Sequence, residues 1–234
     1  MRSGRLRKGS SWNEELKKIG LTLREARELQ RRLALRVIEE DRFERVENIC
    51  GLDVAYHGDT AIACAVVMSR EDMRVIEEEV AYTRVTFPYV PTLLSFRETP
   101  AIIEVARRLK SHVDLFMVDS NGRLHPNLLG AASHFGILVD KPVIGVAKTL
   151  LCGEVQPRKR GERYSLIMLD GRVVGAAVTT RVGAKPVFVS VGHKISLETA
   201  IRIVLETSRL RIPEPLRLAD LLSKSRKKEL KNRL

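Results

Sequence analysis

Two aspartates stand where an uncompensated carboxylate would be costly. Asp53 interrupts the apolar run at residues 49–55, and Asp119 directly follows the apolar run at 115–118. A carboxylate in a buried strand loses its hydration, and a divalent cation can compensate that loss. Hard cations such as Mg²⁺ bind one or two carboxylates together with water and substrate phosphate. If the two strands are neighbours, the pair predicts a magnesium site; the alternative is that each aspartate caps a turn or a helix.

Three further residues could assist chemistry at such a site. Glu98, just before an expected helix, could bind the metal or orient water, or could simply favour the helix N-terminus. Lys148 follows the apolar run at 143–147 and could stabilise charge on a phosphate, although a lysine at a strand end is usually solvated. His193 precedes another expected helix, and a lone histidine there is more often structural.

An aromatic residue lies between two prolines in the segment Pro88-Tyr89-Val90-Pro91. The prolines stiffen the backbone around Tyr89, and a rigid aromatic on a loop could enter a stack of bases as a wedge. A rigid turn with a tyrosine facing the core explains the same residues equally well.

The elements around these residues indicate one mixed sheet. Strands are expected at residues 49–55, 61–68, 74–83, 115–118 and 143–147, and a hairpin turn at Asp170-Gly171. Helices are expected after the capping box Thr22–Glu25, from Pro100 to about Lys110, from Leu128 until Gly136, and after Ser196. An antiparallel meander followed by alternating strands and helices predicts an α/β fold, with parallel strands completing the sheet and helices on both faces.

Composition places the chain among globular proteins of the cytoplasm. Of its 234 residues 44% are hydrophobic and 30% charged, which suits one domain with a sizeable core. No apolar run approaches the roughly 20 residues of a membrane span, and the charged N-terminus is not followed by the apolar stretch of a secretory signal. Three scattered cysteines fit neither a disulfide framework nor a zinc motif. We therefore expect a reduced cytoplasmic protein without a membrane partner.

The net charge of +12 is concentrated at the two ends. Residues 1–36 hold 11 basic and 4 acidic side chains, and residues 202–234 hold 10 and 4, whereas residues 37–201 hold 20 and 21. Such ends could bind phosphates, or could be solvated, disordered tails. We expect a basic, disordered N-terminus at 1–12, one folded domain at 13–222 and a basic tail at 223–234.

Six segments resemble the endonuclease V family in their residues and in their order, from about residue 20 to 222. They are Cys50-Gly-Leu-Asp53-Val-Ala-Tyr56, Pro88-Tyr-Val-Pro-Thr-Leu-Leu-Ser-Phe-Arg-Glu98, Val118-Asp-Ser-Asn-Gly-Arg-Leu-His-Pro126, Ala131-Ala-Ser-His-Phe-Gly136, Gly145-Val-Ala-Lys148 and Ser190-Val-Gly-His-Lys-Ile-Ser-Leu-Glu-Thr199. One such motif would be weak evidence, but six in order are specific.

The resemblance implies an RNase H-like fold with a five-stranded sheet and an acidic site for Mg²⁺, for which Mn²⁺ could substitute. It implies that Asp53 and Asp119 are the metal-binding pair and that Glu98 is the third acid. It further implies that Lys148 lies near the scissile phosphate and His193 near the same site.

The resemblance also implies a substrate and a reaction. Tyr89, held by Pro88 and Pro91, would fill the gap left by a damaged nucleotide that rotates out of the strand. The pocket for that base would be lined by Leu94, Ser120, Gly145, Ala147, Leu151, Cys152 and Gly153. A monomer acting on DNA with deaminated bases would cut the second phosphodiester bond 3′ to deoxyinosine, leaving a 3′-hydroxyl and a 5′-phosphate.

Two departures from the family pattern bear on the substrate. Thr92 and Ser120 stand where the family often has glycine, and their Cβ atoms could reshape the base pocket. Three alternatives remain open: a ribonuclease for inosine-containing RNA, a protein that binds the base without cutting, and another RNase H-like enzyme such as a junction resolvase. The set of three acids argues against simple binding, and the segment around Tyr89 argues against the resolvase.

Overall fold

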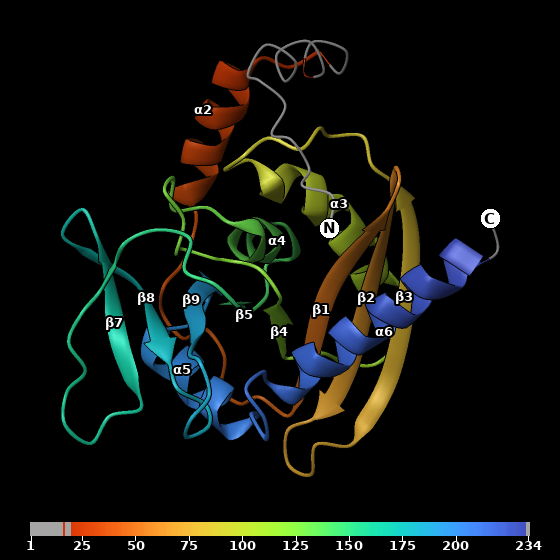
Figure 1. Ribbon diagram of the computed structural model, residues 1–234. Coiled ribbons are helices and arrows are strands. Elements are labelled where there is room, and N and C mark those ends of the chain that lie inside the picture. The colour runs from red at the N-terminus through yellow and green to blue at the C-terminus, as the bar shows by residue number, and fades with distance from the viewer. Residues whose placement is uncertain (1–15, 17–19, 233–234) are drawn as a thin grey trace.

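The computed structural model describes residue 16 and residues 20–232 of the chain (Figure 1). The expected N-terminal segment 1–12 lies outside the described residues. The strands form one nine-stranded sheet in the order β3-β2-β1-β4-β5-β9-β8-β7-β6. Among the described residues, none of the helices combines the length and the apolar character that crossing a membrane requires.

The first five strands form the predicted mixed sheet. β1 (Asn48–His57), β2 (Thr60–Ser69) and β3 (Val75–Arg84) are an antiparallel meander. β1 also pairs in parallel with β4 (Leu115–Val118), and β4 pairs in parallel with β5 (Val143–Ala147). The α/β fold class expected from the sequence is thereby confirmed.

Four antiparallel strands extend the sheet beyond β5. They are β9 (Val187–His193), β8 (Arg172–Val178), β7 (Tyr164–Leu169) and β6 (Glu154–Val155). The predicted hairpin turn joins β7 to β8, with positive φ angles of 48° at Asp170 and 76° at Gly171. Two such residues match the right-handed twist of the flanking strands.

Two helices begin at the residues that the sequence indicates. α2 (Leu23–Ala34) has a complete capping box: Glu25 N–H donates to the Thr22 hydroxyl at 3.2 Å, and Thr22 N–H donates to the Glu25 carboxylate at 2.8 Å. α5 (Leu197–Glu206) is capped by the Ser196 hydroxyl, which accepts a hydrogen bond from Thr199 N–H. Both caps satisfy amides that the helix itself leaves unpaired.

Two predicted helix boundaries are wrong. α3 (Leu94–Arg108) begins before Pro100, which is the seventh residue of the helix and has no amide hydrogen to donate to the carbonyl four residues earlier. α4 (Ala131–Val139) begins after Leu128 and continues through Gly136 to a left-handed Asp140 with φ of 54°. Gly136 is needed for packing, because a Cβ there would lie 2.5 Å from Cβ of His193.

The basic tail expected at 223–234 is helical as far as residue 232. α6 (Glu214–Asn232) is one continuous helix that crosses the proposed boundary after residue 222 (Figure 1). Its first half buries Leu216 and Ala219 against the sheet, and its second half continues in the same helical register.

The helices cover both faces of the sheet, as the pattern predicts. α3 and α4 pack on one face against a cluster that includes Leu52 and Phe116. α5 and the start of α6 pack on the opposite face against a cluster that includes Ile49 and Met117. Because side chains alternate along a strand, Asp53 shares the α6 face with Ile49 and Gly51.

Gly51 allows α6 to lie unusually close to β1. A Cβ at this position would stand 2.1 Å from the carbonyl oxygen of Pro215. The glycine is therefore required by contact with the α6 backbone, and this contact sets the height of α6 above the strand that carries Asp53.

Replacing Gly51 with alanine is expected to lower the free energy of unfolding by about 1–3 kcal/mol, because α6 must move away from β1. Chemical denaturation would measure the loss, and trypsin should cut α6 faster. Gly58→Ala is the matched control: its φ of 56° strains alanine by about 1–2 kcal/mol, but nothing lies within 4 Å. Equal trypsin sensitivity of α6 in both variants would contradict this role for Gly51.

Candidate active site

The pairing of β1 with β4 places Asp53 beside Asp119. The last paired residues of these parallel strands are Leu52 and Val118, and each aspartate is the next residue along its strand. Asp119 N–H donates to the carbonyl of Leu52 at 3.0 Å, which extends the register by one step. Neighbouring strands are about 4.8 Å apart, so the two carboxylates emerge side by side. The adjacency on which the predicted metal site depends is present.

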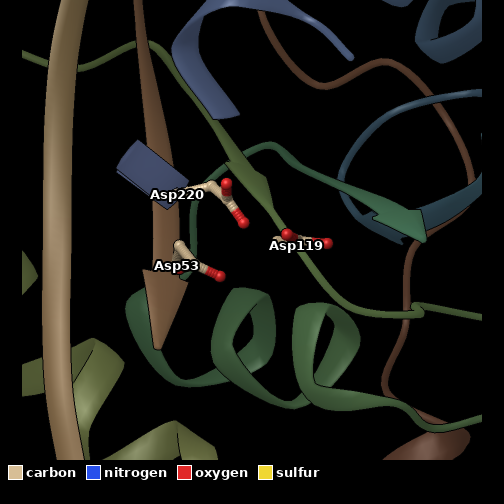
Figure 2. Close-up of side chains that lie close together, drawn as sticks. All are labelled: Asp53, Asp119 and Asp220. Carbon is tan, nitrogen blue, oxygen red and sulfur yellow. The ribbon is translucent and has the colours of Figure 1, made fainter. Parts of the chain in front are cut away.

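A third carboxylate, from α6, completes the group. Carboxylate oxygens of Asp53, Asp119 and Asp220 all lie within 4.8 Å of one another (Figure 2). Ser223, one turn after Asp220, donates a hydrogen bond to Asp53 and so ties the helix to the strand. The close approach of α6 to β1 at Gly51 therefore also places Asp220 beside the other two carboxylates.

Asp220 was not among the expected site residues, because residues 202–234 stand out in the sequence only for their excess of basic side chains. A signal was nevertheless present. Asp220 is the one acidic residue between Glu214 and Glu229, and it is flanked by apolar residues that predict a packed helix. Nothing local indicates that this helix lies over Asp53.

Two lysines partly neutralise the acids. Lys148 Nζ donates to Asp119 and, at 2.9 Å, to Asp220, while Lys224 Nζ lies 2.5 Å from Asp220. Burial acts to lower the pKa of Lys148, but its hydrogen bonds to the two aspartates hold that pKa above its ordinary value. Burial acts to raise the pKa of Asp220, but the two lysines hold it below the ordinary value.

Glu98 approaches the same site from α3. It lines a hollow of about 20 Å³ together with Asp53 and Asp119, large enough for one water molecule or an ion. Burial, then repulsion from Asp53 and Asp119, raises the pKa of Glu98 to about 8, although a hydrogen bond from the Ser120 side chain opposes the rise. Burial also raises the pKa of Asp119 despite its contact with Lys148.

This arrangement fits a divalent cation. The donor atoms are carboxylate oxygens, which hard cations prefer, and the hollow beside them is the size of an ion or a water molecule. Burial and then repulsion from neighbouring carboxylates raise the pKa values of Glu98 and Asp119, and a bound dication would oppose both effects. Asp53, Asp119 and Asp220 are the residues placed to hold it, with Glu98 adjacent.

His193 is not brought to this group. His193 pairs with Val143, the first residue of β5, whereas Lys148 directly follows the last residue of that strand. Val143 and Lys148 are five residues apart, which corresponds to roughly 16 Å along an extended strand. Its Nδ1 accepts a hydrogen bond from Ile38 N–H at 3.2 Å, and its Nε2 lies 3.6 Å from Asp140. In this position the histidine links β9 to the segment before β1.

The proline-flanked loop holds Tyr89 outward on a fixed base. Tyr89 is 57% exposed, while Phe87 and Val90 on either side are buried. Arg97 of α3 donates to the carbonyl of Phe87 at 2.8 Å and anchors the loop. The alternative of a tyrosine facing the core is therefore wrong.

Gln30, fully buried on α2, connects the loop around Tyr89 to the loop at residues 127–129. Its Nε2 donates to the carbonyls of Thr92 at 2.7 Å and Leu129 at 3.0 Å, and its Oε1 accepts from Asn127 at 2.9 Å. Thr92 has a φ of 68°, a conformation that suits glycine. The threonine that stands where the family often has glycine is therefore in a strained backbone conformation.

The expected base-pocket residues fall into two groups. Ser120 and Gly145 lie together near the acids, where a Cβ on Gly145 would stand 2.8 Å from the carbonyl oxygen of Ser120. The loop backbone at 120–122 therefore occupies the space that Gly145 leaves. Cys152 packs near Ile167, and Gly153 lies against Met168 of β7. The remaining members are Leu94 at the start of α3, buried Ala147 and exposed Leu151.

Known proteins match this chain over most of its length. A family model described as Endonuclease V matches residues 31–221. An endonuclease V from Thermofilum pendens is 52% identical over 203 residues, covering 86% of this chain and 87% of the relative. The chain belongs to the endonuclease V family. It is therefore a nuclease, a hydrolase of phosphodiester bonds, and the three clustered aspartates all lie inside the matched region.

Solved endonuclease V structures share the fold. That of Streptomyces avermitilis superposes with a TM-score of 0.83 at 37% identity, covering 90% of this chain and 95% of its own. That of Ciona intestinalis superposes with a TM-score of 0.82 at 32% identity, covering 92% and 99%. The Ciona endonuclease V was solved in complex with a 24mer DNA containing an inosine followed by a ribo-adenosine.

Magnesium is expected to stabilise this endonuclease V against heat through the three aspartates. At a concentration 100 times its Kd, an ion that binds only the folded protein adds about 2.7 kcal/mol, which raises Tm by roughly 5–10 °C for a chain of this size. Asp220→Asn should remove most of that rise in a thermal melt with and without Mg²⁺. Asp140→Asn, at an exposed aspartate, is the control; a full rise in Asp220→Asn would contradict the assignment.

Proposed function

We propose that this endonuclease V uses Mg²⁺ to hydrolyse the second phosphodiester bond 3′ to inosine in a nucleic-acid strand. The observation that carries the proposal is the convergence of Asp53, Asp119 and Asp220 beside Lys148. The inosine-containing DNA bound by the Ciona relative supports the choice of lesion. The oxygen-only donor set favours Mg²⁺, with Mn²⁺ as a substitute.

Each residue of the site then has a distinct task. Asp53, Asp119 and Asp220 hold the ion, which when bound supplies Lewis acidity toward phosphate oxygens and acidifies water. Glu98, which lines the small hollow together with Asp53 and Asp119, is placed to orient the attacking water and to accept its proton. Lys148 keeps a positive charge next to Asp119 and stabilises the negative charge that develops on the phosphate.

Recognition of the base is assigned to the loop around Tyr89. An exposed aromatic ring on an anchored backbone can fill the place of a nucleotide that leaves the stack, at little entropic cost. The displaced base would enter beside Ser120, where the loop backbone at 120–122 offers polar groups.

RNA stays as a second candidate substrate for one reason. The ligand of the Ciona relative places a ribonucleotide directly after the inosine, so that site accommodates a 2′-hydroxyl. Parallel digestion of matched DNA and RNA strands, each with a single inosine, would rank the two substrates.

Replacing Asp53 or Asp119 with alanine is expected to reduce cleavage at least about a hundredfold, because the lost charge stabilisation amounts to several kcal/mol. End-labelled strands with one inosine, incubated with and without Mg²⁺, would measure the rate and the position of the cut. Asp140→Ala should cut normally. Near-normal cutting by either active-site variant would refute the proposed metal site, and cutting at undamaged positions would refute the choice of inosine.

Tyr89→Ala is expected to weaken binding to an inosine-containing strand by about tenfold, because stacking on an aromatic is worth about 1–3 kcal/mol. Binding to an undamaged strand should change much less. Tyr82→Ala removes a tyrosine of similar exposure, 47%, from β3 and serves as the control. Titration of labelled strands in Ca²⁺ would measure the affinity of the original chain and of both variants for each strand, and equal losses on both strands in Tyr89→Ala would remove the wedge role.

A further inference from the structure

The second half of α6 carries four lysines on one side. They are Lys224, Lys227, Lys228 and Lys231, with consecutive spacings of three, one and three residues, and all four are exposed. At 100° of rotation per residue these positions fall within an arc of about 100°. We name these four residues the lysine stripe.

The lysine stripe continues the face that carries Asp220. Lys224 follows Asp220 by four residues, and its Nζ lies 2.5 Å from the carboxylate of Asp220. The neighbouring face of the helix is packed, with Ala219 and Ser223 buried against the sheet. The lysines therefore project on the same side of α6 as the acid that faces the metal site.

Three of these four lysines form no ion pair with the described residues. Within residues 20–232, Lys227, Lys228 and Lys231 have no ion-pair partner. The nearby Arg226, on the other side of the helix, is instead paired with Glu229 at 2.9 Å. Favourable interaction with the helix C-terminus accounts for cations in the last turn only, and the lysine stripe begins well before it.

The stripe is long enough to follow a nucleic-acid backbone. Eleven residues at 1.5 Å each place Lys231 about 16 Å along the axis from Asp220. A duplex rises 3.4 Å per phosphate of one strand, so this length corresponds to about five nucleotides. Figure 1 shows α6 crossing in front of the meander of β1, β2 and β3.

We propose that the lysine stripe binds backbone phosphates of the substrate several nucleotides away from the bond that is cut. The inference rests on the proposed function, because it needs a nucleic-acid strand at Asp220. Family membership does not account for it, since the match to the family model ends at residue 221. The contacts are to phosphate, so they add affinity without reading sequence or lesion.

The test uses the triple substitution Lys227→Gln, Lys228→Gln and Lys231→Gln in the full chain, and leaves Lys224 intact because it touches Asp220. Log affinity falls as log salt concentration rises, and each lost phosphate contact should make that negative slope shallower by about 0.9. The triple variant should therefore lose about 2–3 from the slope and bind a long duplex about 10 to 100 times more weakly at low salt. Fluorescence anisotropy in Ca²⁺ would measure both.

Two variants serve as controls. Arg107→Gln, Lys110→Gln and Lys141→Gln together remove the same charge where β4 and β5 begin, at the opposite end of these strands from Asp119, and should leave the slope unchanged. Arginine at the three substituted positions, 227, 228 and 231, keeps the charge, and this variant should bind like the original chain. Circular dichroism verifies that each variant is folded.

Shortening the duplex stepwise on each side of the inosine gives an independent readout. The original chain should lose affinity when one particular side is trimmed, and the glutamine triple should not respond to that trimming. An unchanged slope in the glutamine triple, or an equal loss in the distal control, would overturn the proposal. Failure of the original chain to cut inosine strands in Mg²⁺ would instead overturn the proposed function, because the binding assay does not depend on cleavage.

Discussion

The candidate active site requires three carboxylates to be held within 4.8 Å of one another. Two unit charges 4 Å apart repel by about 4 kcal/mol at an effective dielectric constant of 20, so the carboxylates would separate if they were free. Parallel pairing of β1 with β4 fixes two of them, and the contact of α6 with Gly51 fixes the third. Lys148 and Lys224 offset part of the charge, and the negative charge that remains favours the binding of a cation.

The sequence predicted those parts of the site whose signals are local. Asp53 and Asp119 interrupt or end apolar strands, and the strands around them were identifiable from their composition. Glu98 and Lys148 were found for the same reason, because each lies at the end of a recognisable element. The caps at Thr22 and Ser196 and the Asp170-Gly171 turn were equally local, and they were confirmed.

The parts that were missed are set by tertiary packing. Asp220 belongs to a helix that looks basic and surface-exposed until it is placed over β1. Gly136 resembles a helix stop, yet it lies inside α4 because His193 takes the space of its Cβ. His193 itself was expected at the acids on the strength of its motif alone, and it lies at the other end of β5. Ser120 and Thr92 likewise owe their roles to partners far away in the chain, Glu98 and Gln30.

Asp220 is the last of the three clustered aspartates to be synthesised, because it lies near the C-terminal end of the chain. The three aspartates are spread over most of the polypeptide, and the last of them belongs to the final helix of the described structure. A chain truncated before residue 214 therefore keeps every strand of the sheet but only two of the three clustered carboxylates, and it lacks the helix that covers Gly51.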